Sequence, residues 1–189
     1  MNMAELTPME KSLARLREGN EMYLAYGRSD GNVTAAMRLR TAKEGQKPFA
    51  TILTCSDSRV IPEVIFGCGI GDIFTIRVAG NVVDPHQLGS IEYAAGHLGT
   101  PVTVVLGHTH CGAVAAAMEG HADGYIGSIT QEIQQAIGDT KDDYEACARN
   151  VRYNVRKIQE AFAAHPELKE HTVVGAVYDI ASGRVEWLF

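Results

Sequence analysis

The 189-residue chain has no apolar run long enough to cross a bilayer, and its first residues lack the charged-then-apolar pattern of a secretory signal. Cysteine is scarce. The four cysteines stand at positions 55, 68, 111 and 147, unlike the disulfide framework of a secreted protein. A basic excess is also missing, because the net charge is −6, which argues against nucleic acid or an anionic membrane as the main partner. The expected location is the cytoplasm.

What is present is an ordinary globular composition, with 46% hydrophobic and 21% charged residues. A single domain over residues 1–189 is therefore expected, with an N-terminal helical arm over about residues 5–44. The segment Thr7-Pro8-Met9-Glu10 has the form of a capping box with proline at the first helical position, and it predicts a helix from Thr7 to about Tyr26. The apolar stripe of this helix would pack on the same chain or on a partner subunit, and it consists of Leu13, Leu16, Met22 and Tyr23.

From Pro48 onward, strand-like and helix-like segments alternate. This alternation predicts an α/β fold: a mainly parallel sheet flanked by helices, with an antiparallel edge strand at the C-terminal end. The first four expected strands look buried on both faces. The expected strands are 49–55, 73–78, 102–107, 172–178 and 184–189, and the expected helices are 62–66, 90–98, 113–118, 128–136 and 142 to about 164.

Two short clusters of metal-binding residue types follow two of the expected strands. Cys55 and Asp57 lie in TCSDSR, and His108 and Cys111 lie in GHTHC. Sites in open α/β sheets form beyond the carboxyl ends of the strands, so both clusters stand where a site is expected. Cysteine, histidine and carboxylate side chains bind Zn²⁺, and four of them complete a tetrahedron. Zinc is favoured over iron because the ligands mix sulfur, nitrogen and oxygen.

Asp57 and Arg59 determine which kind of zinc site this would be. If Asp57 binds the metal, the site is closed. If Arg59 holds the Asp57 carboxylate in a bidentate ion pair, the fourth position is open to water and the site is catalytic. A plain surface ion pair is the third interpretation.

The remaining cysteines and one histidine give weaker signals. Cys68 and Cys147 stand apart from the clusters and are expected to be small core residues. His110 lies between two of the expected ligands, where either a proton relay or a structural role is open.

Several longer motifs resemble the β-class carbonic anhydrases through most of the chain. They are CSDSRVIPEVIF, GIGDIFTIRVAGN, GSIEYAAGHLG, VTVVLGHTHCGAV and VVGAVYDIASGRV. The resemblance implies zinc-dependent, reversible hydration of carbon dioxide to bicarbonate and a proton, by attack of a zinc-bound hydroxide. It makes Cys55, His108 and Cys111 the permanent ligands of one Zn²⁺ per chain. Asp57 would either ligate zinc or, held by Arg59, accept a hydrogen bond from the hydroxide.

The resemblance also implies a substrate pocket shared between subunits. Gln46 would contact the substrate, and Phe74 and Tyr93 would form aromatic walls. All three could serve the zinc of a neighbouring chain in a homodimer or homotetramer. Some bacterial members have an inhibitory bicarbonate site of tryptophan, arginine and tyrosine. Arg77 and Tyr178 match the last two, but Ile52 stands at the tryptophan position.

Two alternatives remain on the same scaffold. A carbonyl sulfide or carbon disulfide hydrolase would present the same hydroxide to a similar linear substrate. A non-catalytic protein that binds zinc or bicarbonate would be expected to lack Asp57, Arg59 or Gln46, and all three are present.

Overall fold

The computed structural model describes residues 6–169 and 171–188. Helix α1 (Pro8–Tyr26) begins at the predicted capping box, in which the Thr7 hydroxyl accepts from the Glu10 amide and the Glu10 carboxylate accepts from the Thr7 amide. The helix prediction is confirmed. Its apolar stripe is only partly packed within this chain: Leu16 is fully buried in the core, whereas Met22 is 42% exposed.

The helical arm expected over about residues 5–44 also contains α2 (Ala35–Glu44), whose separate bounds were not predicted. This helix is capped by Thr34, and none of its residues is buried. It lies further from the sheet than α1, and the apolar side chains of Val33 and Leu39 are 64% and 65% exposed there. Helix α2 therefore has little packing within its own chain.

The predicted sheet is confirmed, with strand order β2-β1-β3-β4-β5. The first four strands are parallel, and β5 pairs with β4 in the antiparallel direction. Full burial of the first four strands was wrong for β2, an edge strand on which Phe74, Thr75 and Arg77 are partly or fully exposed. The strands are β1 (Ala50–Thr54), β2 (Ile73–Arg77), β3 (Val102–His108), β4 (Thr172–Tyr178) and β5 (Val185–Trp187).

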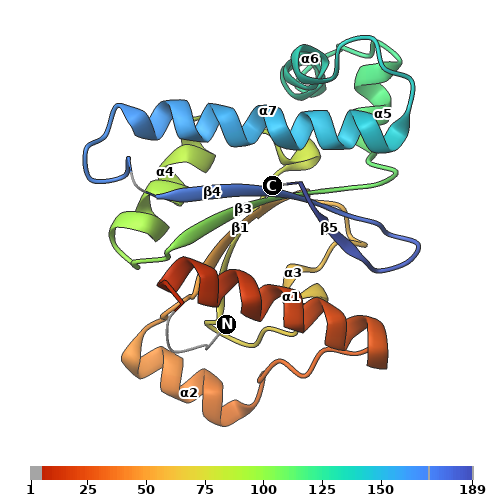
Figure 1. Ribbon diagram of the computed structural model, residues 1–189. Helices are drawn as coiled ribbons and strands as arrows, with labels where there is room; N and C mark the ends of the chain where they lie inside the picture. Colours follow the sequence, from red (N-terminus) through yellow and green to blue (C-terminus); the bar gives the residue numbers. More distant parts are fainter. Residues whose placement is uncertain (1–5, 170, 189) are drawn as a thin grey trace.

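Helices cover both faces of the sheet (Figure 1). Because successive strand residues point to opposite faces, Ile52 packs on the α1 side, with Leu16, while Leu53 packs on the α7 side, with Ile158. The remaining helical elements are α3 (Pro62–Ile65), the 3₁₀ turn η2 (Ala79–Asn81), α4 (Pro85–Gly96), α5 (Gly112–Met118), α6 (Ile126–Ile137) and α7 (Asp143–Ala163).

Helix α4 begins five residues before the predicted start at residue 90, because Asp84 and Gln87 form a second capping box with Pro85 at the first helical position. Within the described ranges, no helix is both long and apolar enough to cross a membrane.

Candidate metal centre and its surroundings

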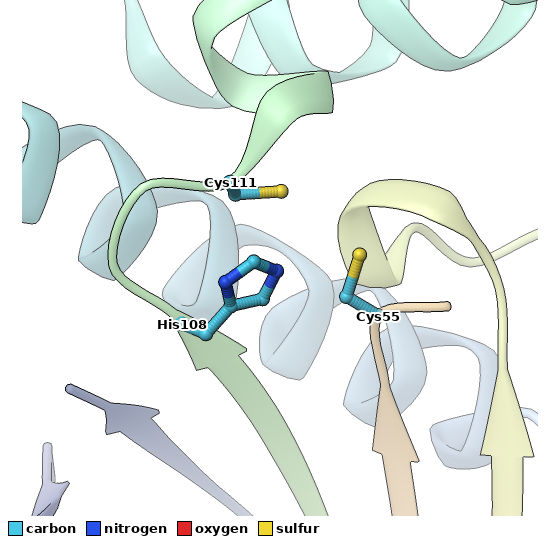
Figure 2. A group of neighbouring side chains, drawn as sticks. All are labelled: Cys55, His108 and Cys111. Atoms are coloured by element: carbon cyan, nitrogen blue, oxygen red, sulfur yellow. The ribbon is translucent and has the colours of Figure 1, made fainter. Parts of the chain in front are cut away.

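Three expected ligands meet at the carboxyl ends of neighbouring parallel strands. Cys55 directly follows β1, His108 ends β3, and Cys111 caps α5 after a tight turn. Figure 2 shows both sulfur atoms and the imidazole pointing toward a common space. One ligand atom from each residue lies within 4.8 Å of the others, and all three residues are buried. Two sulfurs and one nitrogen at this spacing fit Zn²⁺.

The imidazole of His108 is already oriented to bind a metal. Its Nδ1 lies 2.9 Å from the carbonyl oxygen of Thr109, which fixes the proton on Nδ1 and leaves the lone pair on Nε2. Nε2 is buried and has no hydrogen-bond partner. A buried nitrogen without a partner is costly, so a ligand for Nε2 is expected. The carbonyl of Thr109 thus acts as the outer partner that metal-bound histidines usually have.

Cys55 and Cys111 shift each other's pKa in opposite directions. A hydrogen bond with Cys111 lowers the pKa of Cys55 well below its usual value, against the opposing effect of burial. The same hydrogen bond, together with burial, raises the pKa of Cys111. Because thiolates rather than thiols bind metal ions, both cysteines would give up their protons to a bound metal.

Asp57 and Arg59 form a bidentate ion pair beside these ligands. Arg59 Nε lies 2.9 Å from Asp57 Oδ1, and Nη2 lies 2.7 Å from Oδ2. The Arg59 side chain holds the pKa of Asp57 well below its ordinary value, so this carboxylate is ionised. Both carboxylate oxygens are therefore occupied, which is the arrangement expected for a site with an open fourth position.

The ion pair is supported from two further elements. Arg59 Nη2 also donates to the carbonyl of His110 at 3.1 Å, and the amide of His110 donates to Asp143 at the start of α7, at 2.8 Å. Arg77, at the end of β2, donates to the Asp57 carbonyl at 2.7 Å. His110 has a positive φ of 55°, which is unusual for a residue other than glycine, so these contacts hold a strained turn.

Gln46, Phe74 and Tyr93 do not lie at the metal ligands of their own chain. Phe74 pairs in register with Thr51, four residues before Cys55, or about 13 Å back along the strand. Tyr93 lies beside Phe74, with ring centroids 6.1 Å apart, and is 46% exposed. Gln46 is exposed in the loop before β1. The structure brings the two aromatic rings together, at the opposite end of β1 from the ligands.

The other two cysteines are buried core residues, as expected. Burial raises the pKa of both Cys68 and Cys147 to about 12, so both thiols stay protonated. Ile52 packs in the same core cluster as Tyr178, and Arg77 is engaged with Asp57.

Three residues that contribute to the site were not predicted from the sequence. The amide of Gly80 donates to the Cys55 sulfur at 3.3 Å, Asn150 on α7 holds the Gly80 carbonyl, and Asp143 holds His110. The signal for Asn150 was a polar residue on the apolar face of a long helix. The other two contacts join segments that only the fold brings together.

Comparison with known proteins identifies the family. Residues 50–185 match the family model described as carbonic anhydrase. Carbonic anhydrase 2 of Mycobacterium tuberculosis is 42% identical over 127 residues, which is 65% of this chain and 61% of that protein. The carbonic anhydrase of Mycolicibacterium smegmatis is 36% identical over 186 residues, covering 90% and 89% of the two chains. The crystal structure of a β-carbonic anhydrase of Aspergillus fumigatus superposes with a TM-score of 0.72 at 25% identity, covering 96% of this chain and 91% of that one.

The chain belongs to the β-class carbonic anhydrase family. β-Carbonic anhydrases use zinc, and the Cys55, His108 and Cys111 group fits that ion. The family match favours this class over the two alternative functions considered from the sequence.

Proposed function

We propose that the protein catalyses the reversible hydration of carbon dioxide to bicarbonate and a proton. The observation that carries this proposal is a buried Cys-His-Cys group placed beside a carboxylate that an arginine holds in a bidentate ion pair. Cys55, His108 and Cys111 hold one Zn²⁺ per chain. The bound ion lowers the pKa of water and so supplies a nucleophile near neutral pH.

Asp57 would accept a hydrogen bond from a proton-bearing molecule, such as water or hydroxide, beside the three ligands. An ionised carboxylate is an acceptor only, so it favours hydroxide or water over a ligand without a proton and orients the oxygen lone pair toward carbon dioxide. Arg59 keeps Asp57 ionised and turned away from the three ligands. The carbonyl of His110 fixes Arg59 in turn. These residues are pre-organised, which reduces the rearrangement needed during the reaction.

The working assembly is a homodimer or a larger even-numbered oligomer. Phe74 and Tyr93 lie too far from their own chain's ligands to line that pocket, and Tyr93 is exposed. Val33, just before α2, and Leu39 on α2 are also exposed, as in an arm that packs on a second copy. A β-carbonic anhydrase of Sordaria macrospora, with a TM-score of 0.65 and 25% identity over 82% of this chain, is described as tetrameric. Phe74, Tyr93 and Gln46 then serve the partner's substrate pocket.

A cytoplasmic location is part of this proposal. Its four cysteines are all unpaired, which is typical of a reducing compartment.

Stopped-flow hydration of carbon dioxide by the zinc-loaded protein tests the function, with Asp57→Ala measured alongside. We expect Asp57→Ala to keep one zinc per chain and to lose about 10²- to 10⁴-fold in kcat/KM, the usual range for a positioned acid–base group. Asp30→Ala is a matched control, because Asp30 also pairs with an arginine two residues away, Arg28, at 3.3 Å. It should keep full activity.

Two results would contradict the proposal in different ways. Zinc-loaded protein without hydration activity would exclude the proposed reaction. Loss of zinc from Asp57→Ala would make Asp57 a structural residue and leave the reaction itself standing.

A further inference from the structure

Helix α7 carries two buried asparagines on its apolar face. Asn150 is 1% exposed and Asn154 is fully buried. Asn154 Nδ2 donates to the backbone oxygen and to Oδ1 of Asn150, at 2.9 and 3.1 Å. Burying amides in a core is costly unless they are hydrogen bonded, and apolar residues would pack there at lower cost. The pair therefore needs an explanation beyond packing.

The explanation lies in what Asn150 holds. Because Asn154 fixes Asn150 Oδ1, Asn150 Nδ2 is directed at the carbonyl oxygen of Gly80, 2.8 Å away. Gly80 has a φ of +68° and the next residue, Asn81, a φ of +45°. Glycine adopts a positive φ without steric cost and asparagine tolerates it better than most residues, so this pair suits a tight turn. The hydrogen bond from Asn150 fixes where that turn lies.

The turn presents one group to the metal centre. The Gly80 amide donates to the sulfur of Cys55 at 3.3 Å. Only this amide of the turn reaches the sulfur, because the next one, of Asn81, donates to the carbonyl of Val78 at 3.0 Å. A hydrogen bond to a thiolate draws charge away from the sulfur, so it changes how strongly that sulfur donates electrons to a bound metal.

We propose that Asn150, oriented by Asn154, is a positioning residue that holds the Gly80 amide on Cys55 and thereby sets the charge that this thiolate presents to the metal. The proposal rests on metal binding by Cys55, His108 and Cys111, which is part of the proposed function, but it does not depend on the substrate. Asn150 reaches the sulfur through the carbonyl and amide of Gly80, and among the described residues it makes no hydrogen bond to a metal ligand itself.

Cobalt(II) substitution tests this without reference to activity. The thiolate-to-cobalt charge-transfer band moves to longer wavelength when a thiolate loses a hydrogen-bond donor and becomes more electron-rich. We expect that shift in Asn150→Ala, and a smaller shift in the same direction in Asn154→Ala. The double variant Asn150→Leu/Asn154→Leu should shift like Asn150→Ala while replacing the amides by apolar groups of similar size, which protects the fold if the alanine variant is unstable.

Asn20→Ala is the matched control. Asn20 is also a buried amide, but it lies on α1, on the other face of the sheet, and bonds Gly183 and Val185 at 2.9 and 3.0 Å. It should lose stability without moving the band. An unshifted band in the double leucine variant, or an equal shift in Asn20→Ala, would overturn the proposal. A normal cobalt band in a protein that does not hydrate carbon dioxide would refute the proposed reaction alone.

Discussion

Substitution of Gly107 by alanine tests the close approach of α7 to the strand that carries His108. A Cβ atom at residue 107 would lie 2.5 Å from Cγ2 of Val151, and the next neighbours are an ordinary 3.6 Å or more away. The clash therefore involves one methyl group. Overpacking of this kind typically costs about 1–3 kcal/mol in the free energy of unfolding.

Val151→Ala removes that methyl group. Because Val151 is fully buried, this change alone should cost about 2–3 kcal/mol, from two lost methyl groups and the cavity they leave. In the double variant the new Cβ enters the space that the valine vacated. We expect the double variant to be about as stable as Val151→Ala alone. Its loss of stability should therefore be about 1–3 kcal/mol smaller than the sum of the losses in the two single variants.

Urea unfolding of the parent protein, the two single variants and the double variant, all at one protein concentration, gives the four free energies of unfolding. A zinc titration of the same four proteins measures the affinity of the metal site. Gly107→Ala should also weaken zinc binding, since His108 is the next residue, and Val151→Ala should restore it. Additivity of the two substitutions within about 0.5 kcal/mol would show that residues 107 and 151 do not compete for space and would refute the reasoning.

Two further predictions concern catalysis. The thiolates of Cys55 and Cys111 offset the charge of Zn²⁺, so the pKa of water at the site should be lowered less than in an all-histidine site. Hydration activity should therefore rise from about pH 6.5 to 9. A flat stopped-flow profile over this range would contradict the prediction. Asp143→Ala should lower kcat about 10-fold with zinc retained, because it releases the His110 turn that holds Arg59. Asp143→Asn keeps an oxygen acceptor for the His110 amide and should recover most of the activity, and equal losses in both variants would exclude this positioning role.

Much of the fold could be predicted because the local sequence signals, such as caps and apolar runs, coincide with the segments that are buried in the structure. The Thr7 capping box defined the start of α1, and the apolar runs marked the strands within about one residue at most ends. The bounds of α2 within the expected helical arm were not predicted, because this helix buries no residue and so has no apolar stripe to detect. Asp84 offered a capping box for α4 that was overlooked.

The metal ligands could be predicted from the sequence, but the residues that hold the surrounding turns in place could not. Cys55, His108 and Cys111 stand at strand ends, where topology alone brings them together. Asp143 and Asn150 act on turns that are 33 and 70 residues away in sequence, respectively. Their roles depend on how α7 packs across the sheet, and no local pattern encodes that packing. Gly80-Asn81 is a pair that readily forms a tight turn, but its contact with Cys55 depends on the fold.

The metal ligands lie at one end of β1, and the rings of Phe74 on β2 and Tyr93 on α4 lie beside its other end. If each chain lends its rings to its partner, defects in the ligands and in the rings should complement each other. A mixed dimer of Cys55→Ala and Tyr93→Ala chains would then contain one site with both defects and one site with none. Mixing two nearly inactive proteins and allowing their subunits to exchange would recover part of the activity, and the two copies of the chain would form a single functional unit.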